Sequence, residues 1–139
     1  QKKFILKMHP DIDEINVLEF IKPTSNIIIT KYDDIIKLIA SSTLVIAIDL
    51  STTIIEAQIL KKPVISINVK NHPFGVSEIF KSNACHCVKM DSLEDELKKI
   101  ILDDAYKKKM IVEGTNFVNN YVSNQGSSSN EILNQLENI

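Results

Sequence analysis

The stretch LVIAIDLSTTIIEAQILKKPVISI, residues Leu44–Ile67, decides the fold class of this chain. It begins with the uninterrupted apolar run Leu44–Ile48, which is typical of a strand covered on both faces. Thr53–Lys61 then carries apolar residues with no helix breaker, and Val64–Ile67 is a second apolar run. The order strand, helix, strand predicts a parallel pair of strands joined through a helix.

The same alternation continues in both directions from this stretch. Further strands are predicted at Lys3–Met8, Asn26–Ile29 and Cys85–Val88. Helices are predicted at Asp11–Phe20, Asp33–Ser41, Ser77–Lys81, Ser92–Leu102, Asp104–Tyr121 and Asn130–Ile139. We therefore predict an α/β fold: a Rossmann-like parallel sheet of four to five strands, with helices on both faces and carboxy-terminal helices.

Length and composition indicate one ordinary domain. The 139 residues are 44% apolar and 24% charged, and we interpret residues 1–139 as a single Rossmann-like domain with a polar linker near 123–129. The net charge of −2 gives no reason to expect a nucleic-acid partner. No apolar run approaches the roughly 18 residues of a membrane span. Because Cys85 and Cys87 are too close together to link distant parts of a fold, we predict a reducing, cytoplasmic setting.

Polar residues follow the predicted strands, where ligands bind in open parallel sheets. His9 follows the first strand, Asp49 the third and His72 the fourth. The turn after the third strand also holds Ser51, Thr52 and Thr53, next to a predicted helix start. Amide N–H groups at such a start attract anions, and the hydroxyl groups would add donors for a phosphate or diphosphate. Glu56, one turn further on, could accept hydrogen bonds from ribose hydroxyl groups.

Each of these residues also has a purely structural interpretation. Thr53-x-x-Glu56 is the spacing of a capping box, which needs no ligand. Asp49 could be a turn residue at a strand end. His9 and His72 each precede a proline, which suits a turn former as well as a general acid or base at neutral pH.

Metal-binding and nucleotide-binding templates are otherwise lacking. Cys85-His86-Cys87 places two thiols on one strand face without a second pair of ligands, so no metal site is expected. The sequence contains no GxxxxGK[ST], GxGxxG, GxSxG or HExxH motif.

A resemblance to a known family rests on two segments. KMHP (Lys7–Pro10), and IIKLIASSTLVIAIDLSTTIIEAQILKKPVISIN (Ile35–Asn68), resemble the carboxy-terminal, donor-nucleotide-binding domain of GT-B-fold glycosyltransferases. The nearest group makes surface polysaccharides and includes CDP-glycerol glycerophosphotransferase-like enzymes. The resemblance covers roughly Phe4 to Asn68, about half the chain, and the following segments match in order and spacing: Ser41–Ala47, Asp49–Thr53, Glu56-Ala57 and Lys62–Ile65.

The resemblance implies a nucleotide-activated sugar or CDP-polyol as donor substrate, with no cofactor required. It assigns Ser51 and Thr52 to the diphosphate, Glu56 to the ribose, and His9 to the phosphates as a hydrogen-bond donor or acid. The reaction would transfer a sugar or polyol phosphate to an acceptor held by an amino-terminal domain that this chain lacks. We therefore expect the chain to be an inactive fragment of a two-domain enzyme.

Two further function classes stay open. A UDP-sugar 2-epimerase-like half would place a glycine beside the phosphate, and Leu50–Thr53 has none. A non-catalytic α/β binding or regulatory module, such as a receiver, would have an acidic cluster after its first strand, where this chain has His9 and Pro10. Partners to be considered are a membrane surface, contacted peripherally by the full enzyme, and a second copy, contacted through the apolar face of Asn130–Ile139.

Overall fold

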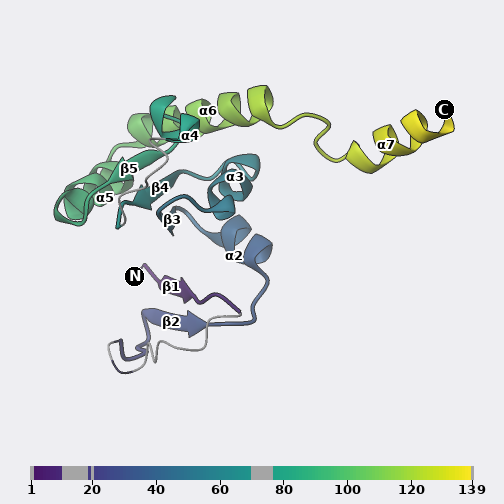
Figure 1. The fold of residues 1–139 in the computed structure, drawn as a ribbon. Coiled ribbons are helices and arrows are strands. Elements are labelled where there is room, and N and C mark those ends of the chain that lie inside the picture. Colours follow the sequence, from purple (N-terminus) through teal and green to yellow (C-terminus); the bar gives the residue numbers. More distant parts are fainter. Residues whose placement is uncertain (1, 11–18, 20, 70–76, 139) are drawn as a thin grey trace. The chain divides into compact units, whose positions relative to one another are not determined.

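The computed structural model describes residues 2–10, 19, 21–69 and 77–138 (Figure 1). The chain divides into two compact units, Gln1–Ser41 and Ser42–Ile139, and each is described by itself. Except for Glu19, the helix predicted at Asp11–Phe20 lies outside the described residues.

The first unit contains a pair of parallel strands and a short helix. Strands β1 (Phe4–Lys7) and β2 (Ile27–Thr30) pair along their whole length. Helix α2 (Ile35–Ser41) begins just after Asp34 because the carboxylate Oδ1 of that residue accepts the amide N–H of Ile36 at 2.9 Å. A side-chain oxygen in this position satisfies an amide that the first helical turn leaves without a partner.

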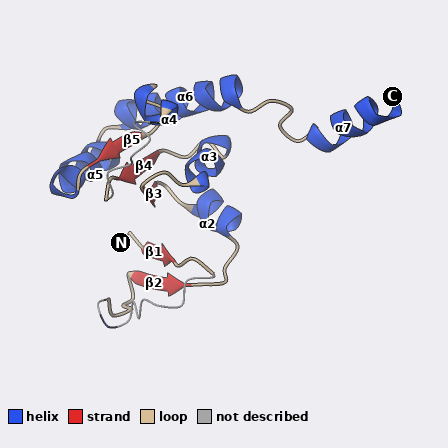
Figure 2. Ribbon diagram, viewed as in Figure 1, coloured by secondary structure: helices blue, strands red, loops and turns tan. Residues whose placement is uncertain are grey.

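The second unit is built on a three-stranded parallel sheet (Figure 2). Its strands β3 (Val45–Ile48), β4 (Val64–Ile67) and β5 (His86–Val88) are hydrogen-bonded in that order. In the register of the ladders, Ile65 pairs with Ile46 on one side and with His86 on the other. The prediction of an α/β fold with parallel strands is thus confirmed.

The prediction of one sheet of four to five strands is wrong for the described residues. The five strands form two separate sheets, β1-β2 and β3-β4-β5. An apolar pattern identifies a strand, but the pairing of strands depends on hydrogen bonds between distant segments. The local patterns therefore located the strands without showing where one sheet stops and the next begins.

The helices of the second unit follow the sequence patterns closely. Helix α6 has the predicted bounds, and Gly114 does not interrupt it. The helical elements are α3 (Thr52–Ile59), α4 (Glu78–Lys81), the 3₁₀ turn η1 (Met90–Ser92), α5 (Leu93–Leu102), α6 (Asp104–Tyr121) and α7 (Ser128–Glu137). No helix among the described residues is long and apolar enough to cross a membrane.

The core of this unit surrounds the central strand. Ile65 packs with Ile100 of α5 and Met110 of α6, and all three side chains are buried. Removing such a side chain from water contributes about 1.5–3 kcal/mol. All four residues of β4 are buried, and successive strand side chains point to opposite faces, so both faces of this strand are covered.

Candidate functional site

The turn between β3 and α3 starts with Asp49 in the left-handed backbone region, at φ 51°. Aspartate is one of the few residues with a side chain that adopt this conformation readily. Its carboxylate Oδ1 accepts the amide N–H of Val69 at 2.8 Å, and its carbonyl oxygen accepts the hydroxyl of buried Ser66 at 2.6 Å. Asp49 therefore connects the carboxyl end of β3, through hydrogen bonds, to β4 and to the residues that follow β4.

The cap of helix α3 is Ser51. Its backbone is extended, and its side-chain oxygen accepts the amide N–H of Thr53 at 3.3 Å. The capping-box interpretation of Thr53-x-x-Glu56 therefore does not hold, because Thr53 already lies inside the helix. The cap lies two residues before Thr53, and Glu56 is therefore five residues after it rather than the three of a capping box.

Several polar groups of this turn are available for hydrogen bonds to a ligand. Thr52 is exposed and Glu56 is half-buried. Among the described residues, no hydrogen bond engages the Thr52 amide, the Thr52 hydroxyl or the Glu56 carboxylate. An amide and a hydroxyl group at the start of an eight-residue helix can bind an anion. The carboxylate one turn later can accept hydrogen bonds from a ligand's hydroxyl groups.

The predicted site residues fall into three groups. Asp49, Ser51, Thr52, Thr53 and Glu56 come together in and just after the β3–α3 turn. His9 is exposed and follows β1 in the first unit, where the amide of the residue before it donates to Thr30 O at 2.8 Å. His72 lies outside the described residues.

A second polar cluster joins three elements of the second unit. Tyr106 of α6 donates its hydroxyl proton to Glu96 Oε1 of α5 at 2.6 Å. Nδ1 of His86, at the start of β5, lies 2.9 Å from Glu96 Oε1 and 2.8 Å from Tyr106 Oη. The cluster could not be predicted from the sequence, because its members lie ten positions apart and no short motif connects them.

The electrostatics of the cluster determine where its protons are. Burial raises the pKa of Tyr106, and the hydrogen bond to Glu96 raises it further, so the phenol is neutral and donates. Burial would raise the pKa of Glu96, but the hydrogen bonds from Tyr106 and His86 outweigh this effect and lower it. The single Tyr106 proton is directed to Glu96, so both contacts of the His86 Nδ1 atom require a proton on that nitrogen.

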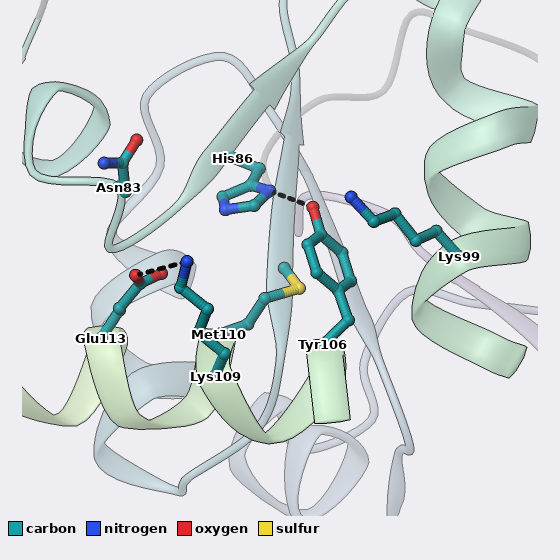
Figure 3. Close-up of a pocket in the computed structure, with 7 residues that line it drawn as sticks. All are labelled: Asn83, His86, Lys99, Tyr106, Lys109, Met110 and Glu113. Carbon is teal, nitrogen blue, oxygen red and sulfur yellow. Dashed lines mark hydrogen bonds and ion pairs between the residues drawn. The ribbon is translucent and has the colours of Figure 1, made fainter. Parts of the chain in front are cut away.

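This protonation leaves Nε2 of a neutral His86 ring with its lone pair. Figure 3 shows that nitrogen directed away from Tyr106, toward the side on which Asn83 and Lys109 lie. Lys99 Nζ lies 3.8 Å from the centroid of the Tyr106 ring, in a cation–π contact. His86, Asn83, Lys109, Lys99 and Tyr106 all border a cavity of about 310 Å³.

The two cysteines differ in exposure. Cys85 is buried, and burial raises the pKa of its thiol to about 12. Cys87 is exposed and pairs with Ser66 across the β4–β5 ladder. Among the described residues, no group of three or more His, Cys, Asp or Glu side chains could hold a metal ion.

Comparison with known proteins does not assign the chain to a family. No protein-family model matches it, and no curated protein is significantly similar to it.

Proposed function

We propose that the second unit is the Rossmann-like, donor-nucleotide-binding half of a glycosyltransferase-like enzyme of surface polysaccharide synthesis. The observation that carries this proposal is the β3–α3 turn, in which Ser51 caps the helix while the Thr52 amide and hydroxyl stay available. The turn lies at the carboxyl end of a parallel strand, which is where nucleotides bind in open α/β sheets.

The proposed ligand is the diphosphate of a nucleotide-activated sugar or CDP-polyol. The Thr52 amide points from the positive end of the α3 dipole, and the hydroxyl groups of Ser51 and Thr52 add donors for phosphate oxygens. Ser51 accepts one hydrogen bond through its oxygen, and its own proton can still be donated. Glu56 would accept hydrogen bonds from the ribose hydroxyl groups.

In the transfer reaction, negative charge develops on the departing nucleotide. Preformed donors of the turn would stabilise that charge without having to reorganise during the reaction. The acceptor would be held by a separate domain, and the chain itself should bind the nucleotide.

Calorimetric titration with UDP, CDP and GDP tests this proposal. One nucleotide should bind saturably, and Thr52→Ala and Glu56→Gln should each weaken it about tenfold, the loss expected for one hydrogen bond to a charged group. Ser51→Gly removes the hydroxyl with a cap penalty of only a few tenths of a kcal/mol.

Glu131→Gln on α7 is the matched control, since it removes an equal charge from an exposed helix position remote in sequence from the turn. It should leave the dissociation constant unchanged. A folded chain that binds none of the three nucleotides, or that binds one equally well in all variants, would overturn the donor-site proposal.

A further inference from the structure

We propose that the cavity beside His86 binds a small phosphate monoester and is a second ligand site of this chain. The cavity has a volume of about 310 Å³ and lies between residues at the start of β5 and residues of α5 and α6. Small-molecule sites typically have volumes of roughly 300–1,000 Å³. The proposal stands on a different set of side chains from the β3–α3 turn and does not depend on the function proposed for that turn.

The charge of the lining favours an anion. Within the described residues, the charged side chains that border the cavity are Lys99, Lys109 and Glu113, so the two lysines outnumber the one carboxylate. Lys109 Nζ is 3.8 Å from Glu113 Oε1, the outer limit of an ion pair, and Lys99 lies over an aromatic ring. A bound phosphate would take the place of Glu113 as the partner of Lys109 and would lie beside the Lys99 ammonium group.

Asn83, and His86 when both of its ring nitrogens carry protons, add donors to the two lysines. Asn83 and His86 both line the cavity, and Figure 3 shows the Nε2 side of His86 turned toward Asn83 and Lys109 and away from Lys99. A phosphate monoester offers three oxygens, and these four side chains can satisfy them from several directions. A carboxylate offers two oxygens and would leave part of this donor set unused.

The Glu96–Tyr106 pair gives His86 a defined orientation in this site. Hydrogen bonds of 2.9 Å and 2.8 Å fix its Nδ1 side, so the ring cannot turn without losing both. When both ring nitrogens carry protons, Nε2 can donate a hydrogen bond to a bound phosphate. Glu96 and Tyr106 are therefore positioning residues, and His86 is the ligand-binding one.

Titration of the 139-residue chain with inorganic phosphate and with ribose 5-phosphate tests the site. NMR of the imidazole nitrogens should show saturable shifts of the His86 Nε2 signal. Lys99→Gln and His86→Gln should each weaken binding about tenfold, as loss of one charge-assisted hydrogen bond does. Glu113→Gln should strengthen binding, because it removes the negative charge from the lining.

Lys98→Gln is the matched control for Lys99→Gln. Lys98 lies next to it on α5 but is exposed and ion-paired with Glu94 at 2.7 Å, so its loss should leave phosphate affinity unchanged. Equal weakening by both lysine variants would show a diffuse charge effect and overturn the proposal. Citrate binding as tight as that of ribose 5-phosphate would overturn the phosphate assignment, and so would a folded chain with no shift at His86.

Discussion

Gly114 of α6 lies directly against the side chain of Gln58 in α3: a Cβ atom at Gly114 would be only 2.9 Å from Gln58 Cγ. Real Cβ atoms essentially never approach a heavy atom so closely. Gln58 is itself buried, and its Nε2 donates to Ala84 O at 2.7 Å, just before β5. The absence of a side chain at Gly114 thus allows the two helices to meet over a buried hydrogen bond.

Gly114→Ala should destabilise the chain, although alanine is the better helix former. Helix propensity favours the change by about 1 kcal/mol. Overpacking against Gln58 costs about 1–3 kcal/mol and strains the bond to Ala84. Urea unfolding should show a net loss of stability, whereas Asn116→Ala at an exposed position of the same helix should show none.

Truncating Gln58 makes the same test sharper. In a Gln58→Ala background the opposing Cγ is gone, so Gly114→Ala should become neutral or stabilising. The double-mutant cycle isolates this coupling from the loss of the Ala84 bond, because that loss is common to the Gln58→Ala single variant and the double variant. If Gly114→Ala stabilised the parent chain, the close contact would be incorrect.

The cap of α3 yields a second stability prediction. Ser51→Ala should lower the free energy of unfolding by about 1 kcal/mol, and Ser51→Gly by only a few tenths. Thr53→Ala should cost less than Ser51→Ala because Thr53 contributes its amide, and not its hydroxyl, to the cap. If Thr53→Ala cost more stability than Ser51→Ala in urea unfolding, Thr53 would be the cap residue, as the capping-box spacing suggests.

Helix α6 and the cap of α3 show which features could be predicted from the sequence. The 3.6-residue pattern located α6 with its final bounds, and the apolar runs at Leu44–Ile48 and Val64–Ile67 located two strands that do pair in parallel. Both signals are local, since they depend only on which side of an element is buried. The capping-box spacing of Thr53 and Glu56 was present in the sequence, but the helix begins earlier, after the left-handed residue Asp49, and Ser51 is its cap.

Features that require distant segments to meet could not be predicted in this way. Nothing local separates the β1-β2 sheet from the β3-β4-β5 sheet. His86, Glu96 and Tyr106 are unremarkable polar residues until β5, α5 and α6 bring them within hydrogen-bonding distance. The spacing of the Ser51–Thr53 hydroxyl groups was visible in the sequence, but which of them caps the helix depends on the backbone.

The cysteines should react at different rates with a thiol reagent. Thiolate is the reactive form, and a pKa raised from 9.0 to about 12 leaves Cys85 with roughly a thousandfold less of it at neutral pH. Burial also raises the pKa of Cys87, followed by the charge of Asp49, but this side chain is exposed. One thiol should therefore react in the native chain and two in denaturant.

Cys87→Ser should abolish the native reaction, and Cys85→Ser should leave its rate unchanged. Both variants expose one thiol in denaturant, which controls for protein concentration. Equal native rates for the two single variants would contradict the burial of Cys85.

The hydrogen bonds to Glu96 predict how stability changes with pH. They lower its folded-state pKa below the ordinary value of 4.5, against the opposing effect of burial. A carboxyl group with a lowered folded-state pKa stabilises the fold above its unfolded-state pKa, and this contribution is lost as the pH falls through the folded-state value. Glu96→Gln should thus destabilise the chain above about pH 6, and the gap to the parent should narrow below about pH 4.5. Urea unfolding across this range measures the gap. Glu94→Gln is the control, because Glu94 is exposed and is held only by a surface ion pair with Lys98. This variant should show little loss of stability at any pH in the range. A gap that stays constant into acid, or widens there, would mean that Glu96 acts through packing alone and that its carboxylate does not orient His86.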